Sequence, residues 1–364
     1  MSKAAELAKI GEVLTNSQIG GRRNIAFNGA MQVAQRGTSS TGLGANGDAF
    51  LLDRFRVTAA STAGRYTMTQ TADGPSGFAN CLKIVCTTAD TSIAAGENLV
   101  LVQGLEGQDL QQFKKGTSDA EKFTVSFYVK GHDAATYTFE MFDGDNTRQV
   151  SQTFSVTTDW TRVILTFPAD TTGAFGDDNG ASLYLQICLH AGSTFTSGTL
   201  NTSWASNTNA NRYSSDQNSI FESTSATFFI TGFQLEVGSQ ATPFEHRSFG
   251  EELTLCRRYF QELCDGVSSN ILAAMSYYTS TVSYGYFKLS PEMRAAPTVA
   301  VADVSHFTIF SGANGRVTSN LAASGTYSTK SMRLQGTTAA STLGFSGFLQ
   351  TNNADASIHL IAEL

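Results

Sequence analysis

The chain has 364 residues, with 24 basic and 31 acidic side chains and a formal net charge of -7. This balance argues against nucleic-acid binding, which requires a basic face, and no run of residues reaches the length of about 18 apolar residues that spans a membrane. Charged residues make up only 15% of the chain, and glycine occupies 33 positions against 5 for proline. Such a composition is typical of an all-β protein, and the length indicates about two or three domains.

A short helix is the first element expected along the chain, over residues 2–14. Ser2 can cap it, and its apolar side chains recur at spacings of three and four (Leu7, Ile10, Val13 and Leu14). A helix of this length is marginal in water by itself, so we expect the segment 1–21 to act as an anchor that docks on the body of the chain, on a sister chain or on a larger assembly. The segment lacks the long apolar core of a signal peptide, and we expect synthesis in the cytoplasm of a host cell.

The body of the chain, residues 22–247, is predicted to consist of successive strands. Apolar side chains alternate with polar ones in segments bounded by Gly, Asp, Asn or Pro, namely 123–131, 136–146, 160–170, 182–192 and 226–238. Strands at this spacing, without helices between them, predict a β-sandwich. The stretch 193–225 is long, rich in Ser, Thr and Asn, and poor in apolar residues, so we expect a functional or mobile loop there.

A change of pattern at Ser248 predicts one connecting helix over 248–265. Ser248 and Glu251 form a capping box, and an apolar face follows at helical spacing (Leu253, Cys256, Tyr259, Phe260 and Leu263). Alternating segments return after Gly266 and are separated by Gly-Asn, Asn-Gly and Ser-Gly turns. Residues 266–364 are therefore predicted to form a smaller C-terminal antiparallel β-domain.

The cysteines do not form a pattern typical of disulfides or of a metal site. They are Cys81, Cys86, Cys188, Cys256 and Cys264, an odd number without a CxxC pair. Cys81 and Cys86 lie five residues apart on a predicted strand and therefore face opposite sides of it. We expect reduced, mostly buried thiols, no bound metal and no cofactor.

Three segments of the body resemble the jelly rolls of carbohydrate-binding modules. NIAFNGAMQVAQRG (24–37) is similar to their opening strand, where Asn-Gly follows an apolar pair. KFTVSFYVKG (122–131) and DWTRVILTF (159–167) resemble their central pair of strands, and FFITGFQLEVGSQATPFEHRS (228–248) resembles their closing strand and exit. The order and spacing of these segments imply a jelly-roll domain over 22–247.

Other segments resemble virion proteins of bacteriophages. ATPFEHRSFGEELTLCRRYFQ (241–261), LSPEMRAAPTVAV (289–301) and NGAMQVAQRGTS (28–39) are similar to segments of tail-fibre and related proteins of phages and prophages. This resemblance implies a structural virion protein, in the first place a homotrimeric tail fibre that binds a glycan on the host surface. The N-terminal segment would then bind other virion proteins.

Two other functions are consistent with the same resemblance. A capsid decoration or cement protein would use the same domains to cover seams of the shell. A polysaccharide-degrading tail spike would act on host capsule, but such spikes carry a long stacked β-helix, and no regular short-period repeat predicts one here.

The titratable residues indicate no enzyme. The carboxylate pairs Asp143/Asp145 and Asp177/Asp178 stand in turn-like stretches rich in Gly and Asn, where Asp is expected for backbone reasons. The histidines are scattered, and no GxSxG or evident Ser-His-Asp pattern accompanies them (His132, His190, His246, His306 and His359).

Aromatic side chains in polar loops are the candidates for glycan contact, because the C–H face of a pyranose ring stacks on an aromatic ring. Trp204 lies in the stretch 193–225 with Tyr213 and Asn209, and its ring either pins the loop to the body or meets a partner. Trp160 begins a strand, and the resemblance implies that it packs inward. A second aromatic cluster, in the C-terminal domain, is equally suited to packing between chains (Tyr277, Tyr278, Tyr284 and Tyr286).

Contacts between subunits are expected through the connecting helix and the C-terminal strands, with Leu253, Tyr259, Phe260, Tyr284 and Tyr286 as candidate interface residues. Related modules often bind a structural calcium ion through acids near their first and last strands. This chain has Ala30, Thr231 and Gly232 at those places, so most of the oxygen ligands that calcium prefers are missing.

Overall fold

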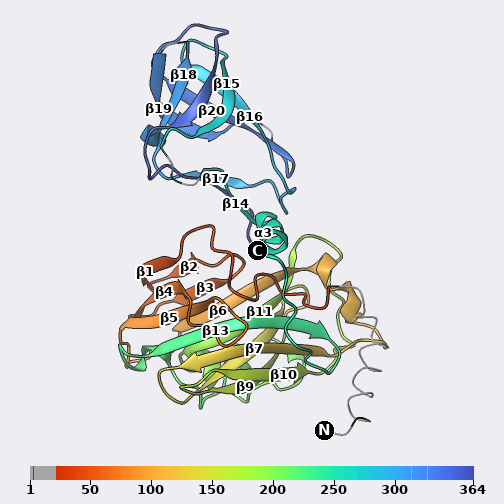
Figure 1. Cartoon of the computed structure of the whole chain (residues 1–364). Helices are drawn as coiled ribbons and strands as arrows, with labels where there is room; N and C mark the ends of the chain where they lie inside the picture. Colours follow the sequence, from red (N-terminus) through yellow and green to blue (C-terminus); the bar gives the residue numbers. More distant parts are fainter. Residues whose placement is uncertain (1–2, 4–21, 265, 267, 313, 326) are drawn as a thin grey trace. The chain divides into compact units, whose positions relative to one another are not determined.

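A computed structural model describes residues 3, 22–264, 266, 268–312, 314–325 and 327–364 (Figure 1). The predicted all-β class is confirmed, since antiparallel sheets and a closed barrel make up nearly all of the regular structure. The helix expected over 2–14 lies outside the described residues, apart from Lys3. Among the described residues, no helix is long and apolar enough to cross a membrane.

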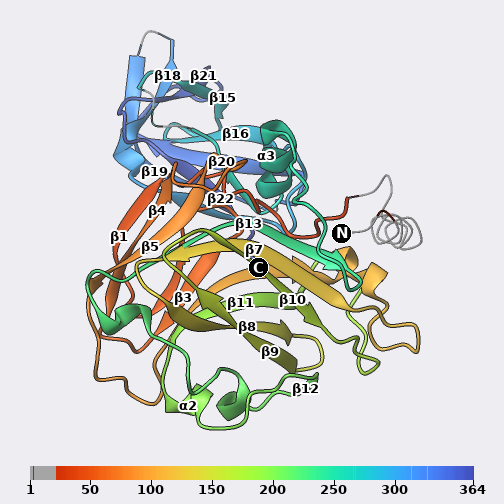
Figure 2. The same ribbon diagram turned by 60° about the horizontal axis from the view of Figure 1, so that its bottom comes forward.

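The chain divides into two compact units, residues 1–252 with Leu364, and residues 253–363. The first unit contains two antiparallel sheets that face each other (Figure 2). The six-stranded sheet has the order β1 (Ser39–Leu43), β4 (Arg65–Thr71), β5 (Cys81–Thr88), β13 (Thr227–Val237), β7 (Phe123–Gly131) and β10 (Thr161–Phe167). The seven-stranded sheet has the order β12 (Ala205–Ser206), β9 (Arg148–Val156), β8 (Ala135–Asp143), β11 (Ala181–Ala191), β6 (Asn98–Glu106), β3 (Arg56–Ala60) and β2 (Gly47–Phe50).

Aromatic rings fill the space between the two sheets. Phe127 of β7 lies 5.8 Å from Phe139 of β8 and 5.8 Å from Phe233 of β13, measured between ring centroids. All three side chains are buried because residues of one parity along each strand point inward. Burial of this many large apolar side chains is the main force that holds the sheets together.

The predicted strands of the body agree with the structure to within about three residues, and the predicted range 123–131 has the same first and last residues as β7. Short helices connect other strands: η1 (Gly107–Asp109), η2 (Gln111–Phe113), α2 (Ser193–Thr196), η3 (Asn209–Asn211) and η4 (Ile220–Glu222). The five cysteines are all buried, as expected from the sequence.

The connecting helix is shorter than predicted. Helix α3 (Phe249–Arg257) begins at the predicted cap, where the Glu251 amide donates to Ser248 Oγ over 3.3 Å, but it ends eight residues before 265. Tyr259 and Phe260 follow the helix, and β14 (Phe260–Glu262) pairs with β22 (Ile358–Ile361). The prediction failed because both side chains fit the helical period, whereas pairing with β22, which lies far along the chain, places Phe260 in a strand.

The second unit is a barrel with a small accompanying sheet. The barrel closes in the order β15 (Ile271–Tyr277), β16 (Val282–Lys288), β20 (Ser331–Thr338), β19 (Asn314–Ala323), β18 (Phe307–Ser311) and β21 (Ser346–Thr351). The small sheet has the order β14, β22 and β17 (Thr298–Val301), and η5 (Val304–His306) precedes β18. A closed barrel leaves no unpaired edge strand.

Candidate functional site

The outward face of the seven-stranded sheet carries a row of polar side chains. In β11, Leu183, Leu185 and Ile187 are buried in the core, so Tyr184 and Gln186 point outward. The strand registers place Gln186 opposite Val102 and Glu140, and Val102 opposite Arg56. Side chains from β3, β6, β11 and β8 therefore lie side by side across the middle of the sheet.

Next to this row lies a pair of half-buried aromatic rings, Tyr184 and Phe142, which we call the aromatic pair. Their ring centroids are 6.1 Å apart, and the two residues are direct partners in the register of β11 and β8. Tyr184 stands opposite Gly104, and a Cβ atom at Gly144 would lie 3.1 Å from its ring. The glycines therefore leave space for the tyrosine ring against the sheet. Arg56 carries its guanidinium 5.8 Å from the Tyr184 ring.

The stretch 193–225 packs on the same face of the sheet. Tyr213 is 1% exposed and contacts Val100, Val102 and Cys188 on β6 and β11. The Ser151 amide of β9 donates to the Asn201 carbonyl over 2.7 Å, which ties the stretch to the edge of the sheet. The loop thus forms one wall above the row.

A hollow of about 150 Å³ lies between this wall and the sheet; we call it the sheet-face pocket. It is lined by Arg56, Thr58, Asn98, Val100, Val102, Gln186, Arg212 and Tyr213. The Tyr213 hydroxyl is buried and has no hydrogen-bond partner in the described part of the chain. The pocket therefore combines an aromatic residue, two guanidinium groups and two amide side chains.

Arg212 is held in this wall by a buried ion pair. Its Nη2 lies 2.6 Å from Glu140 Oε2, and it also donates to Gln186 Oε1 over 3.2 Å. Burial raises the pKa of the Glu140 carboxyl, an effect that the neighbouring guanidinium only partly offsets. Burial opposes the charge of Arg212, but Tyr213 and Glu140 outweigh it and raise the pKa of the guanidinium. Arg212 is thus a fixed cation at the pocket.

Of the three predicted glycan-contact residues, only Tyr213 lines this pocket. Trp204 is anchored to the body, since its indole N–H donates to the Pro168 carbonyl over 2.9 Å and its ring lies 5.7 Å from that of Phe123. Asn209 is exposed at the start of η3. Of the two roles open to Trp204, its contacts fit the pinning of the loop.

A buried lysine lies beside Trp204 and forms what we call the lysine cluster. Lys115 Nζ lies 2.5 Å from Asp143 Oδ2, 3.1 Å from Asp170 Oδ2 and 5.3 Å from the Trp204 ring. Arg148 Nε also donates to Asp170, over 2.8 Å. Two cations thus balance two carboxylates, and the cluster ties Trp204 and its loop to the sandwich.

Trp160 does not pack inward, contrary to the prediction. Val163, Leu165 and Phe167 are the buried residues of β10, so Trp160 shares the outward parity of Arg162. Its half-buried ring lies 6.2 Å from Phe229, and Lys130 Nζ stands 5.4 Å from it on the outside of the six-stranded sheet. The alternation of side chains along β10 therefore decides the orientation of Trp160, and the inward position that the resemblance implied is wrong.

Three of the four carboxylates considered for catalysis accept a backbone hydrogen bond, and the first of them, Asp143, accepts from the Asn146 amide over 3.0 Å. Asp143 belongs to the lysine cluster, whereas Asp145 accepts from the Gly176 amide over 2.8 Å. Asp178 accepts from the Gly180 amide over 2.8 Å. These contacts are those expected of aspartates that stabilise turns.

The candidate interface residues differ in accessibility. Tyr259 and Phe260 are fully buried within the chain, so their side chains are not available to a partner subunit. Leu253 and Tyr284 are partly buried, and Tyr286 is 70% exposed. Tyr286 is therefore the most accessible of the five.

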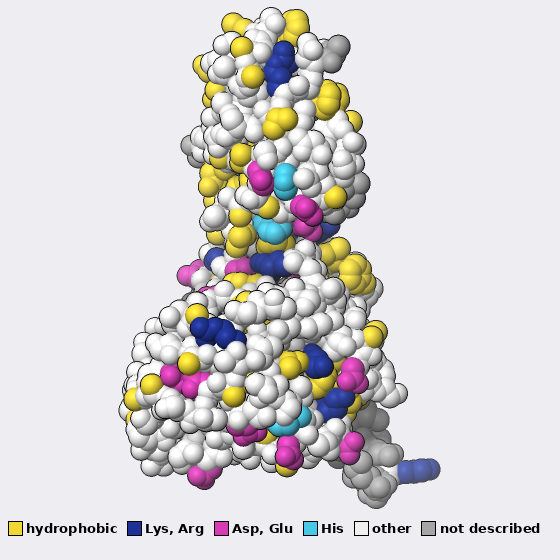
Figure 3. Space-filling view, turned by 90° about the vertical axis from the view of Figure 1, so that its left-hand side faces the viewer, with side chains coloured by type: hydrophobic (Ala, Val, Ile, Leu, Met, Phe, Trp, Pro, Cys, Tyr) yellow, Lys and Arg dark blue, Asp and Glu magenta, His cyan; other side chains and the backbone are white. Residues whose placement is uncertain are grey.

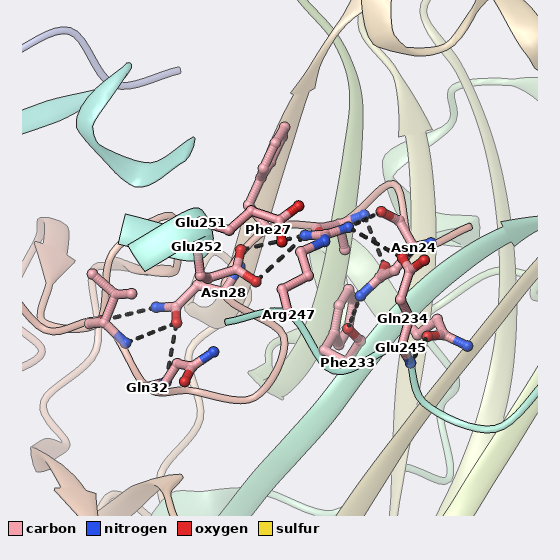
Figure 4. Close-up of polar contacts among 12 residues, drawn as sticks. Asn24, Phe27, Asn28, Gln32, Phe233, Gln234, Glu245, Arg247, Glu251 and Glu252 are labelled. Carbon is pink, nitrogen blue, oxygen red and sulfur yellow. Dashed lines mark hydrogen bonds and ion pairs between the residues drawn. The ribbon is translucent and has the colours of Figure 1, made fainter. Parts of the chain in front are cut away.

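The residues near the first and last strands do not fit the calcium site of related modules. The Thr231 hydroxyl donates to the Asn80 carbonyl over 2.8 Å. The nearby carboxylates Glu245 and Glu252 surround the buried guanidinium of Arg247, which also donates to the backbone carbonyls of Asn24 and of Ala26 (Figure 4). The chain's own arginine supplies the positive charge at this place.

Charged groups are sparse on one face of the molecule (Figure 3). On the face drawn in Figure 3, basic and acidic side chains stand mostly singly or in small groups among uncharged ones. This distribution offers no broad basic surface there for a nucleic-acid backbone.

Comparisons with known proteins gave structural neighbours only. No protein-family model matches the sequence, and no curated protein matches it. The chain is similar to a family 11 carbohydrate-binding module from Clostridium thermocellum in complex with a β-1,3-1,4-mixed-linked tetrasaccharide, with 9% identity, a TM-score of 0.29, and coverage of 56% of this chain and 98% of that one. It is similar to a CBM4 structure with 11% identity, a TM-score of 0.30, and coverage of 58% and 97%. It is also similar to the enzymatically active domain of tailspike protein 4 of bacteriophage CBA120, with 11% identity, a TM-score of 0.30, and coverage of 59% and 21%.

Proposed function

We propose that this chain is a non-catalytic, glycan-binding subunit of a bacteriophage tail fibre. The observation that carries glycan binding is the outward face of the seven-stranded sheet. There, the aromatic pair lies beside a pocket lined by Gln186, Asn98 and two arginines. The assignment to a tail fibre is supported by the sequence resemblance of 241–261 and 289–301 to phage virion proteins.

The chemistry of this face suits a sugar. A pyranose ring has an apolar C–H face that stacks on an aromatic ring, and hydroxyl groups that pair with planar amide and guanidinium groups. The volume of about 150 Å³ is well below the roughly 300 Å³ at which pockets for drug-sized ligands begin, so we expect one ring of a longer glycan in it.

Repeated copies would make weak binding sufficient for attachment. A shallow site of this size gives modest affinity. A homotrimeric fibre carries three such sites and one phage particle carries several fibres, so the effective concentration of sites raises the overall affinity for the host surface. Tyr286, which is 70% exposed, would lie between subunits of such a trimer. Light scattering on the purified protein tests whether it forms a trimer. We expect the mass of three chains, and the mass of a monomer would contradict the proposal.

A glycan array tests the binding proposal. We expect the purified chain to bind host surface polysaccharide, and Tyr184→Ala to weaken that binding roughly tenfold, because an aromatic contact contributes about 0.5–1.5 kcal/mol. The matched control is Trp160→Ala, which removes a half-buried aromatic ring on the outside of the six-stranded sheet. Equal affinity of all three proteins would contradict the assigned face, and new reducing ends in the incubated polysaccharide would contradict the absence of catalysis.

Immunogold labelling of intact phage particles tests the location separately. Labelling of tail fibres is the expected result. Labelling over the capsid would instead favour a decoration protein and would leave the glycan-array result unaffected.

A further inference from the structure

Three buried side chains meet at one end of the sandwich, and the glycan site does not use them. Asp90 follows β5, Glu97 precedes β6, and His190 is the penultimate residue of β11. Their exposed fractions are 6%, 5% and 0%. The two carboxylates and the imidazole present ligand atoms that all lie within 4.8 Å of one another.

Each side chain in this group is oriented by neighbours and presents an atom toward the others. His190 Nδ1 lies 2.7 Å from Ser219 Oγ, which leaves Nε2 facing Glu97 Oε2 at 3.2 Å. The Asp90 carboxylate accepts three hydrogen bonds, from the Thr62 hydroxyl and from the amides of residues 63 and 64, all of them at Oδ2. Its Oδ1 accepts none from the described part of the chain. A hydrogen bond on the far ring nitrogen and a fixed carboxylate are the supports that metal ligands usually have.

The charges of the group do not balance without a further cation. Neither Asp90 nor Glu97 forms an ion pair with a lysine or arginine among the described residues. Two ionised carboxylates and one imidazole carry a net charge of -1 when the imidazole is protonated, and a more negative charge when it is neutral. Uncompensated charge in a buried place is strongly unfavourable, whereas a divalent cation with a neutral imidazole brings the sum to zero.

We propose that Asp90, Glu97 and His190 bind one divalent transition-metal ion, with zinc as the best match. An imidazole nitrogen and two carboxylate oxygens form a ligand set of the kind that zinc accepts, with water in the fourth position. Bonds of about 2.0 Å place two tetrahedral ligands roughly 3.3 Å apart, close to the 3.2 Å between Glu97 Oε2 and His190 Nε2. The ion would fasten the loop between β5 and β6 to β11 and, through Ser219, to the end of the stretch 193–225.

The same atoms also form a line that resembles a catalytic triad, Ser219–His190–Glu97. Its hydroxyl is engaged as the cap of η4, where it accepts from the Phe221 amide over 3.0 Å. The Phe221 ring lies 5.2 Å from the fully buried imidazole. A nucleophile must reach a substrate carbonyl, and these contacts favour an internal ion instead.

Zinc content and thermal melting of the full chain test the proposal. After chelation and dialysis, we expect the wild-type protein to regain one equivalent of zinc and a Tm that rises with zinc concentration. His190→Gln and Glu97→Gln should retain only background zinc and show no rise. The matched control is Glu262→Gln, which removes the carboxylate 3.6 Å from His359 in another His–Glu pair and should bind zinc as the wild type does.

Cobalt provides a readout on the wild-type protein if the variants fail to fold. We expect Co²⁺ to give visible d–d absorption bands that one equivalent of Zn²⁺ abolishes. Wild-type protein that retains no zinc, a variant that retains as much as the wild type, or a Tm that responds to Ca²⁺ but not to Zn²⁺ would overturn the proposal. Covalent labelling of Ser219 by a fluorophosphonate would overturn it in favour of the triad.

Discussion

Lys115→Met tests whether the lysine cluster holds the loop that forms the wall of the sheet-face pocket. The lysine side chain is fully buried between Asp143 and Asp170 and also donates to the carbonyls of Thr172 and Gly173, over 2.9 and 2.7 Å. Methionine has a similar length but no charge. The variant therefore leaves two buried carboxylates with Arg148 as their remaining cation.

The expected loss of stability is about 3–5 kcal/mol, the usual effect of removing one member of a buried ion pair. Lys114→Met is the matched control, because the neighbouring lysine is 53% exposed and lies 3.4 Å from Glu121. An exposed pair of this kind contributes about 0–1 kcal/mol. Adding Asp143→Asn to Lys115→Met removes the excess carboxylate and should restore part of the loss.

Urea unfolding followed by tryptophan fluorescence measures this effect. Both tryptophans, Trp160 and Trp204, lie in the first unit, so their emission reports that unit alone. A loss below about 1 kcal/mol in Lys115→Met, equal to that of Lys114→Met, would refute the role assigned to the cluster.

Three further predictions concern acid stability, the core and the thiols. Despite burial, hydrogen bonds from Arg148 and Lys115 lower the pKa of Asp170 below its ordinary value of 3.8. The contribution of Asp170 to the free energy of unfolding is therefore complete above pH 3.8 and is lost as the pH falls through the lower pKa of the folded state. Asp170→Asn should flatten the acid limb of a plot of stability against pH. Phe127→Ala should destabilise the first unit by about 3–5 kcal/mol in urea titrations, and a loss under 1 kcal/mol would contradict its packing. Burial raises the pKa of Cys188 to about 12 and that of Cys81 to about 11, so Ellman's reagent at pH 8 should detect these thiols only after denaturation.

Strand positions such as 123–131 were predictable because apolar side chains alternate with polar ones along the segment. In 123–131, Phe123, Val125, Phe127 and Val129 are fully buried, and each stands two residues from the next. The same rule places Trp160 on the outside, since Val163 and Leu165 have the opposite parity. That information was present in the sequence, and the prediction of an inward tryptophan came from the resemblance instead.

The candidate site could be predicted only in part. Alternation shows that Tyr184 and Gln186 point away from Leu183 and Leu185, but the row with Arg56 depends on two strand registers, which pair residues 46 and 84 positions apart. The sequence likewise separates His190 from Glu97 by 93 residues. No local pattern reports such pairings, because loop connections and strand order decide them.

The helix predicted over 248–265 also shows that local patterns do not report pairing between distant strands. Tyr259 and Phe260 suit a helix by period, yet the pairing of β14 with β22 incorporates Phe260 into a sheet. The partner strand lies about a hundred residues further along the chain, so tertiary pairing overrides the local pattern.

The most direct test of glycan binding compares the two outward faces of the sandwich by calorimetric titration with an oligosaccharide identified on the array. Tyr184→Ala alters the seven-stranded sheet, and Trp160→Ala alters the six-stranded sheet with a half-buried aromatic ring of its own. We expect roughly tenfold weaker binding for Tyr184→Ala, equivalent to about 1.4 kcal/mol, and wild-type affinity for Trp160→Ala. Weaker binding by Trp160→Ala with unchanged affinity of Tyr184→Ala would contradict the assignment of the glycan site.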